Sequence, residues 1–145
     1  MDDLGLRHHV YGTFAATGIA PTVAEIAELV GGLEAAAARL ARLADRHFVV
    51  LGEDGEIAMA LPFAATSTSH RVVADDRRWW ANCAWDALAV PAALSTDARI
   101  EARWLDDESP VDLRIENGRP IGDGRDGFIH FTIPARHWWD DIVET

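Results

Sequence analysis

Apolar residues recur at helical spacing through the first third of the chain and predict three helices followed by a β-hairpin. The helices are expected at residues 4–16, 22–30 and 33–44, and the strands at 47–51 and 56–61. Thr22 and Glu25 form a capping box at the start of the second helix, and Glu53-Asp54-Gly55 is a hairpin turn signal. This order is typical of a winged helix-turn-helix, so residues 1–61 are predicted to form such a module.

The rest of the chain alternates short apolar runs with turn signals and predicts a small mixed or antiparallel β-sheet domain. Strands are expected at 70–73, 98–104, 111–116 and 128–133, and helices at 78–94 and 137–143. A connector rich in Pro, Thr and Ser at 62–69 separates this part from the first. We therefore expect an α+β fold with two domains, 1–61 and 62–145, the second carrying a cysteine-bearing helix.

Composition and charge narrow the classes of partner. The 145 residues are 49% hydrophobic, without an apolar run long enough to span a membrane, and the acidic N-terminus does not resemble a signal peptide. The net charge of −11 opposes binding to nucleic acid, and residues 1–60 hold nine acidic residues against four arginines. The charge therefore favours a structural or dimerising role for the first module, and a homodimer of the chain is one expected assembly. A single cysteine excludes an internal disulfide and favours the cytoplasm.

The most informative chemical feature is the single cysteine, Cys83, three residues before Asp86. In a helix this spacing puts the thiol and the carboxyl on one face. A thiolate is a strong ligand for soft metals, and a carboxyl can take up and hand on a proton, so the pair could cut a metal–carbon bond. The alternative is that Cys83 is a small buried apolar residue and Asp86 a solvated charge.

Tryptophan is frequent, and most of the six are expected in the core. A subset could line an apolar pocket around Cys83, which would suit an organic ligand. The six are Trp79, Trp80, Trp85, Trp104, Trp138 and Trp139.

Three segments together resemble the organomercurial lyase (alkylmercury lyase) family. They are Thr68-Ser69-His70-Arg71-Val72, Arg78-Trp79-Trp80-Ala81-Asn82-Cys83-Ala84-Trp85-Asp86-Ala87-Leu88 and Phe131-Thr132-Ile133-Pro134. The resemblance implies protonolysis of carbon–mercury bonds, with Cys83 as the first thiolate and mercury ligand and Asp86 as the proton carrier. It also implies an organomercurial or another apolar small molecule as ligand, and no resident cofactor.

The family's second catalytic cysteine is expected at Thr145 or just past it, so this sequence resembles the family without that cysteine and without the segment beyond. The resemblance then implies an external thiol as co-substrate, a second subunit, or a partner such as a mercuric reductase. The alternative function is a non-catalytic relative that binds a soft metal or an apolar small molecule, in one version as a winged-helix sensor. A third interpretation keeps the fold with an inert, buried Cys83.

Overall fold

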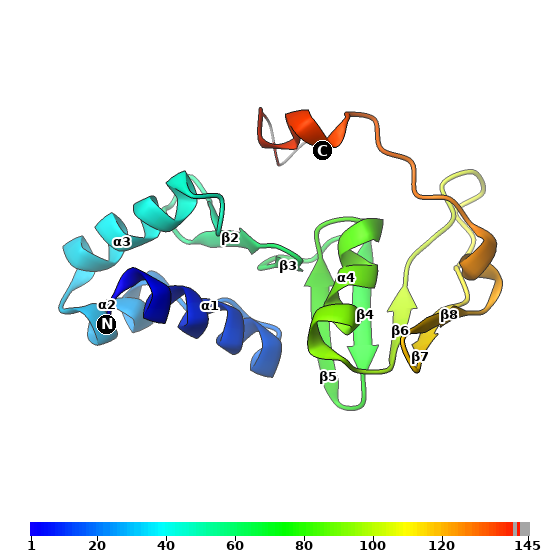
Figure 1. The fold of residues 1–145 in the computed structure, drawn as a ribbon, viewed down its shortest axis with the longest axis horizontal. Helices are drawn as coiled ribbons and strands as arrows, with labels where there is room; N and C mark the ends of the chain where they lie inside the picture. The colour runs from blue at the N-terminus through cyan, green and yellow to red at the C-terminus, as the bar shows by residue number, and fades with distance from the viewer. Residues whose placement is uncertain (141, 143–145) are drawn as a thin grey trace.

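A computed structural model of the chain describes residues 1–140 and 142. Within these residues, eight strands form one antiparallel sheet in the order β1-β2-β3-β5-β4-β6-β7-β8. Helices α1 to α3 lie beside one end of the sheet, and helix α4 lies on its central strands (Figure 1). The expected α+β class with an antiparallel sheet is confirmed. Among the described helices, none has the length and apolar character needed to cross a bilayer.

Three helices open the chain, as the sequence predicts. They are α1 (Asp3–Thr17), α2 (Val23–Val30) and α3 (Leu33–Asp45). The capping box at the start of α2 is present, because Thr22 Oγ1 accepts from the Glu25 N–H and the Glu25 carboxylate accepts from the Thr22 N–H. Leu6, Phe14 and Leu40 are fully buried and join these helices to the core.

Each strand pairs with the next, without a gap, from the N-terminal hairpin to the far edge of the sheet. They are β1 (Val50–Leu51), β2 (Ile57–Ala60), β3 (Phe63–Ala64), β4 (His70–Ala74), β5 (Arg77–Ala81), β6 (Ala98–Glu101), β7 (Leu113–Glu116) and β8 (Arg119–Ile121). β3 pairs with both β2 and β5. The hydrogen-bonded ladder therefore continues across the predicted domain boundary between residues 61 and 62. The N-terminal hairpin of β1 and β2 and the central strands therefore belong to one sheet.

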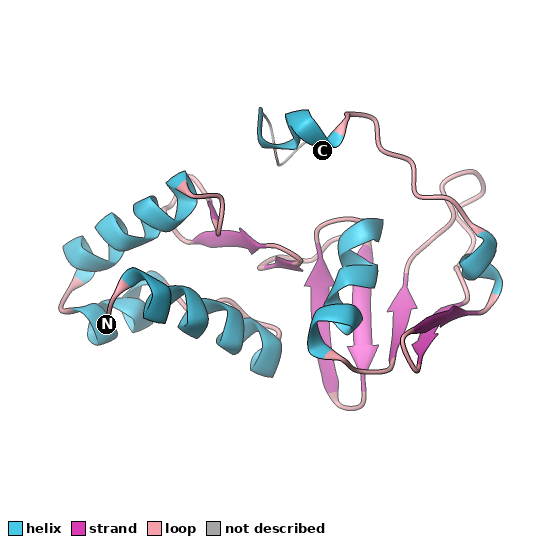
Figure 2. Ribbon diagram, viewed as in Figure 1, coloured by secondary structure: helices cyan, strands magenta, loops and turns pink. Residues whose placement is uncertain are grey.

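The predicted helix over 78–94 is wrong in its first part. Residues 77–81 form β5, and α4 runs from Ala84 to Leu94 (Figure 2). In β5, Trp79 pairs with Val72 of β4, is only 1% exposed, and donates from Nε1 to the Phe14 carbonyl oxygen over 2.9 Å. Strand pairing and burial of this aromatic side chain outweigh the helical preference of the alanines nearby.

The C-terminal part also differs from the prediction. The strand expected at 128–133 is absent from the described ladder, and a 3-10 helix at Ala135–Asp140 replaces the start of the helix expected at 137–143. Asp141 and residues 143–145 lie outside the described residues. The segment returns toward the N-terminal helices, where the Trp139 ring stacks on His47 with 4.0 Å between ring centroids (Figure 1). This course brings Phe131 and Trp138 over the start of α4.

Candidate functional site

Cys83 is the N-cap residue of α4, at the point where the chain leaves β5. Its backbone is extended, with φ −148° and ψ −178°, and its carbonyl oxygen accepts from the Ala87 N–H over 3.0 Å. Asp86 follows in the first turn of the same helix. The i, i+3 spacing therefore does bring the two residues together, although Cys83 starts the helix and does not lie within it.

The Cys83 thiol is half-buried, and burial raises its pKa above the ordinary value of 9.0. The backbone N–H groups of Asp86 and Trp85 lower the thiol pKa, against the effect of burial. The negative charge of the Asp86 carboxylate raises it further. The side chain makes no capping hydrogen bond, so the helix end favours a thiolate only through its exposed N–H dipoles. The protonated thiol is thus the main form near neutral pH, and a thiolate forms when a base or a soft metal displaces the proton.

Asp86 is also half-buried, and burial raises the pKa of its carboxyl group. Two donors act in the opposite direction: the Asn82 amide and the Cys83 thiol. Asn82 donates from Nδ2 to Asp86 Oδ2 over 3.2 Å, and the same nitrogen lies 3.4 Å from the Phe63 carbonyl oxygen. A carboxyl with a raised pKa beside a thiol is suited to receive a proton and release it again.

Asn82 has no predicted role of its own in the sequence. The available signal is its position four residues before Asp86, at the end of a strand that turns into a helix. Its Oδ1 atom is buried and has no hydrogen-bond partner among the described residues.

A small apolar cavity of about 50 Å³ adjoins the thiol and the carboxyl. Its aromatic walls are in contact, because Phe131 lies 6.2 Å from Trp85 and 5.0 Å from Trp138 between ring centroids. The lining comprises Leu61, Asn82, Cys83, Trp85, Asp86, Phe131, Trp138 and Ile142. Two of the six tryptophans, Trp85 and Trp138, thus line this small cavity, while Trp79 belongs to the core.

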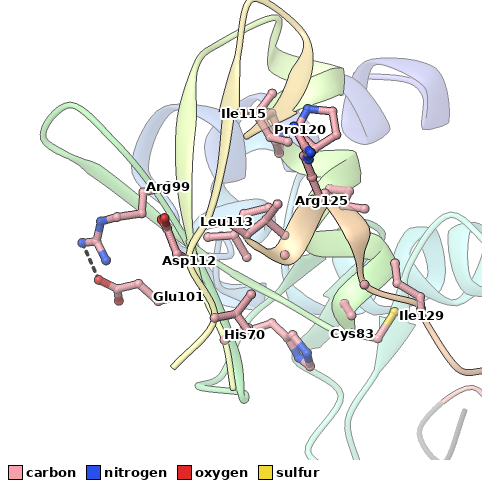
Figure 3. A pocket seen from close by; sticks show the side chains of 18 of the residues that line it. His70, Cys83, Arg99, Glu101, Asp112, Leu113, Ile115, Pro120, Arg125 and Ile129 are labelled. Carbon is pink, nitrogen blue, oxygen red and sulfur yellow. Dashed lines mark ion pairs between the residues drawn. The ribbon is translucent and has the colours of Figure 1, made fainter. Parts of the chain in front are cut away.

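A larger open trough of about 1860 Å³ lies on the other side of Cys83, between α4, the strands β6 and β7, and residues 124–132. His70 and Cys83 lie toward one end of it in Figure 3, and Ile115 and Pro120 toward the other. Cys83 and Phe131 border both the trough and the small cavity. The thiol therefore stands at the junction of an apolar corner and a wide opening.

His70 is a further residue that sequence analysis left without a role. It pairs with Ala81, two residues before Cys83, and Thr68 Oγ1 ties the two strands by donating to the Ala81 carbonyl oxygen over 2.6 Å. Burial lowers the His70 pKa, so its imidazole is neutral at the mouth of the trough. Within the described chain, no three His, Cys, Asp or Glu side chains cluster as a metal centre, so the thiol is not part of such a group.

Comparison with known proteins gives one family match and a likeness to solved structures. Residues 63–145 match the alkylmercury lyase family, MerB. The mercury-bound form of MerB2 superposes with a TM-score of 0.65 at 22% identity, over 82% of this chain and 58% of that one. The chain thus spans 58% of that protein's length, and at this identity the likeness shows the fold alone. No curated protein matches the chain.

Proposed function

This chain belongs to the alkylmercury lyase family, and we propose that it binds an organomercurial through Cys83 and protonates the carbon of the carbon–mercury bond through Asp86. The observation that carries the proposal is the placement of a thiol and a carboxyl with a raised pKa in one helix turn, both facing the same small apolar cavity.

Each residue type fits its proposed step. Mercury is a soft metal and binds thiolate far better than oxygen ligands, so an organomercurial cation displaces the Cys83 proton even though burial raises that thiol's pKa. Asp86 lies beside the departing proton and takes it up as a carboxylate made more basic by burial. The product of this step is an alkylmercury thiolate on Cys83.

The carbon–mercury bond breaks in the second step. A second thiol binds the mercury as thiolate and releases its proton to solvent, while Asp86 delivers the proton it took from Cys83 to the carbon as that carbon leaves. The bond from carbon to mercury is replaced by a bond from carbon to hydrogen, and a second sulfur–mercury bond forms. No electron transfer is involved, and the products are a hydrocarbon and a mercury(II) dithiolate.

The second thiol comes from outside residues 1–145, which contain Cys83 as their one cysteine. Thr145, where the family's second cysteine is expected, lies outside the described residues, and a hydroxyl is a hard, poor ligand for mercury. We propose a small external thiol as co-substrate. A second copy of the chain or a partner such as a mercuric reductase would supply the same chemistry.

The test is hydrocarbon release. Methylmercury is incubated with the purified protein and excess small thiol, and methane in the headspace is measured against a thiol blank. Release above the blank that is lost in both Cys83→Ser and Asp86→Asn supports the proposal, with the exposed Asp76→Asn as matched control. Release that persists in Cys83→Ser contradicts it.

The second candidate function is capture without cleavage, and the single thiol in residues 1–145 favours it. The same assay separates the two, because capture gives stoichiometric mercury on Cys83 and no methane. A sensor version requires DNA binding by the N-terminal part.

We propose that residues 1–61 form a winged-helix-like module with a structural or dimerising role, distinct from the lyase-like residues 62–145. Arg42 and Arg39 of α3 are both engaged by the Asp3 carboxylate, at 2.8 and 3.3 Å. These arginines are the cations that α3 would otherwise offer to phosphates, so their pairing with Asp3 opposes nucleic acid as a partner. A reduced cytoplasm is the proposed location, since the proposed chemistry needs a free thiol.

A further inference from the structure

Cys83 divides the space around it into two cavities of very different size. The small cavity of about 50 Å³ contains the carboxyl of Asp86, whereas the trough of about 1860 Å³ contains His70 and is open to solvent. A mercury atom held on Cys83 has access to both, because the thiol borders both.

We propose that the small cavity is the subsite of the organic group and restricts it to a short alkyl group, methyl or ethyl, while the trough admits the incoming thiol. This inference rests on the proposed function. It adds which side of the mercury each partner occupies and which class of organomercurial the chain accepts.

The position of Asp86 indicates which cavity receives the organic group and which admits the incoming thiol. The carbon must lie next to the group that protonates it, and Asp86 borders the small cavity and not the trough. The incoming thiol brings a polar, hydrated tail, which the wide trough accommodates and the small cavity excludes. During the step the carbon–mercury bond breaks, a sulfur–mercury bond forms from the trough side, Asp86 gives the proton it holds to the carbon, and the proton of the incoming thiol leaves through the trough.

The volume of the small cavity sets the limit on the organic group. An apolar cavity of about 150 Å³ holds one benzene ring, so a cavity of about 50 Å³ leaves room for roughly a third of that group. Methyl meets this limit and ethyl approaches it, whereas the six carbons of a phenyl ring exceed it. An aryl group therefore has to displace a wall.

The walls are apolar and mutually packed. Trp85 and Trp138 both contact Phe131, and Leu61 and Ile142 complete the aliphatic part. The polar groups Asn82 and Asp86 are bound to each other. A hydrocarbon group has no hydrogen bonds with water to lose when it moves to such a surface. A polar substituent would lose its hydrogen bonds there.

Phe131 is the wall to test because it comes from the segment outside the sheet and borders both cavities. Phe131→Ala opens the small cavity toward the trough without touching Cys83, Asp86 or the core. Leu33 on α3 is the control, since it is 63% exposed and borders neither cavity.

The experiment is a competition in the Asp86→Asn background, which keeps Cys83 and removes the proposed proton carrier. Equimolar methylmercury and phenylmercury compete for the protein in a thiol-containing buffer, and mass spectrometry of the intact protein gives the ratio of the two adducts. We expect Phe131→Ala to shift this ratio toward phenylmercury by about tenfold, the usual effect of relieving a steric limit in an apolar pocket. Phe131→Leu should shift the ratio less, and Leu33→Ala not at all.

The outcomes distinguish failure of the proposed subsite from failure of the proposed function. A ratio that Phe131→Ala leaves within about twofold of the parent overturns the subsite, even if the chain releases methane from methylmercury. Absence of both adducts from Cys83 contradicts the proposed function, and the subsite falls with it. Circular dichroism of each variant checks that the fold is retained, and Phe131→Leu supplies the ratio if Phe131→Ala does not fold.

Discussion

The Asn82 amide holds the Asp86 carboxyl from four residues earlier in the chain, with 3.2 Å between Asn82 Nδ2 and Asp86 Oδ2. Asn82 directly follows β5, and Asp86 lies in the first turn of α4, so the strand-to-helix turn fixes both residues. Burial raises the pKa of Asp86, and the Asn82 donor opposes this by stabilising the charged form. The proton affinity of the proposed proton carrier therefore depends on a neighbour that is itself not titratable.

Replacing Asn82 tests this dependence. Asn82→Ala removes a donor to the carboxylate, so the Asp86 pKa should rise further, and Asn82→Asp should raise it more because a like charge is added. Carbon-13 NMR titration of the carboxyl groups measures the shift, with the Asp86 signal assigned by its loss in Asp86→Asn. An unchanged or lower pKa in both variants would contradict the role of this contact.

Asp86→Asn should stabilise the fold at neutral pH. Because the folded-state pKa of Asp86 is raised above its ordinary value of 3.8, folding disfavours the ionised form, and this cost is present above the folded pKa and vanishes below 3.8. We expect the variant to have a melting temperature a few degrees higher at pH 7, and no difference at about pH 3, where both side chains are neutral. Calorimetry at the two pH values measures this, and the exposed Asp76→Asn should show neither effect.

The Cys83 thiol should be slow to alkylate in the native protein. Burial, and to a lesser extent the charge of Asp86, raise its pKa, so little thiolate is present at neutral pH. Asp86→Asn removes that charge and should increase the rate, by severalfold if the effect is about one kcal/mol. Iodoacetamide labelling followed by mass spectrometry is unambiguous, since Cys83 is the one cysteine of the sequence. Native labelling as fast as that of the unfolded protein would contradict the burial of this thiol.

Gly18 should tolerate no side chain. It ends α1 at φ +75°, and a Cβ atom there would lie 2.0 Å from the carbonyl oxygen of Arg78 on β5. We expect Gly18→Ala to lower the free energy of unfolding by about 1–3 kcal/mol, through backbone strain and the displaced strand. Gly12→Ala is the matched control in the same helix: its Cβ meets nothing within 4 Å, and it should raise stability by about 0.5–1 kcal/mol. Urea denaturation measures both, and equal effects would contradict the close contact between α1 and β5.

Local signals in the sequence were sufficient for the N-terminal helices and for the pairing of the two proposed catalytic residues. The Thr22–Glu25 capping box acts within four residues, and its geometry is the one expected. Cys83 and Asp86 are also neighbours through local geometry, because an N-cap residue and the third residue of a helix lie at the same helix end. Contacts of this range depend on backbone geometry alone, which is why the sequence could predict them.

The sequence could not predict features that depend on distant partners. Residues 77–81 became a strand because β4 and β3 pair with them and because Trp79 reaches the Phe14 carbonyl across 65 positions. Phe131 and Trp138 line the cavity at Cys83 because their segment crosses over α4, outside any ladder of the described sheet. The sequence by itself was enough to single out Cys83 and Asp86 as the residues proposed to carry the chemistry. The tertiary structure decided how far they are buried, and hence their pKa values and the space left for an organic group, because burial is set by side chains remote in the chain.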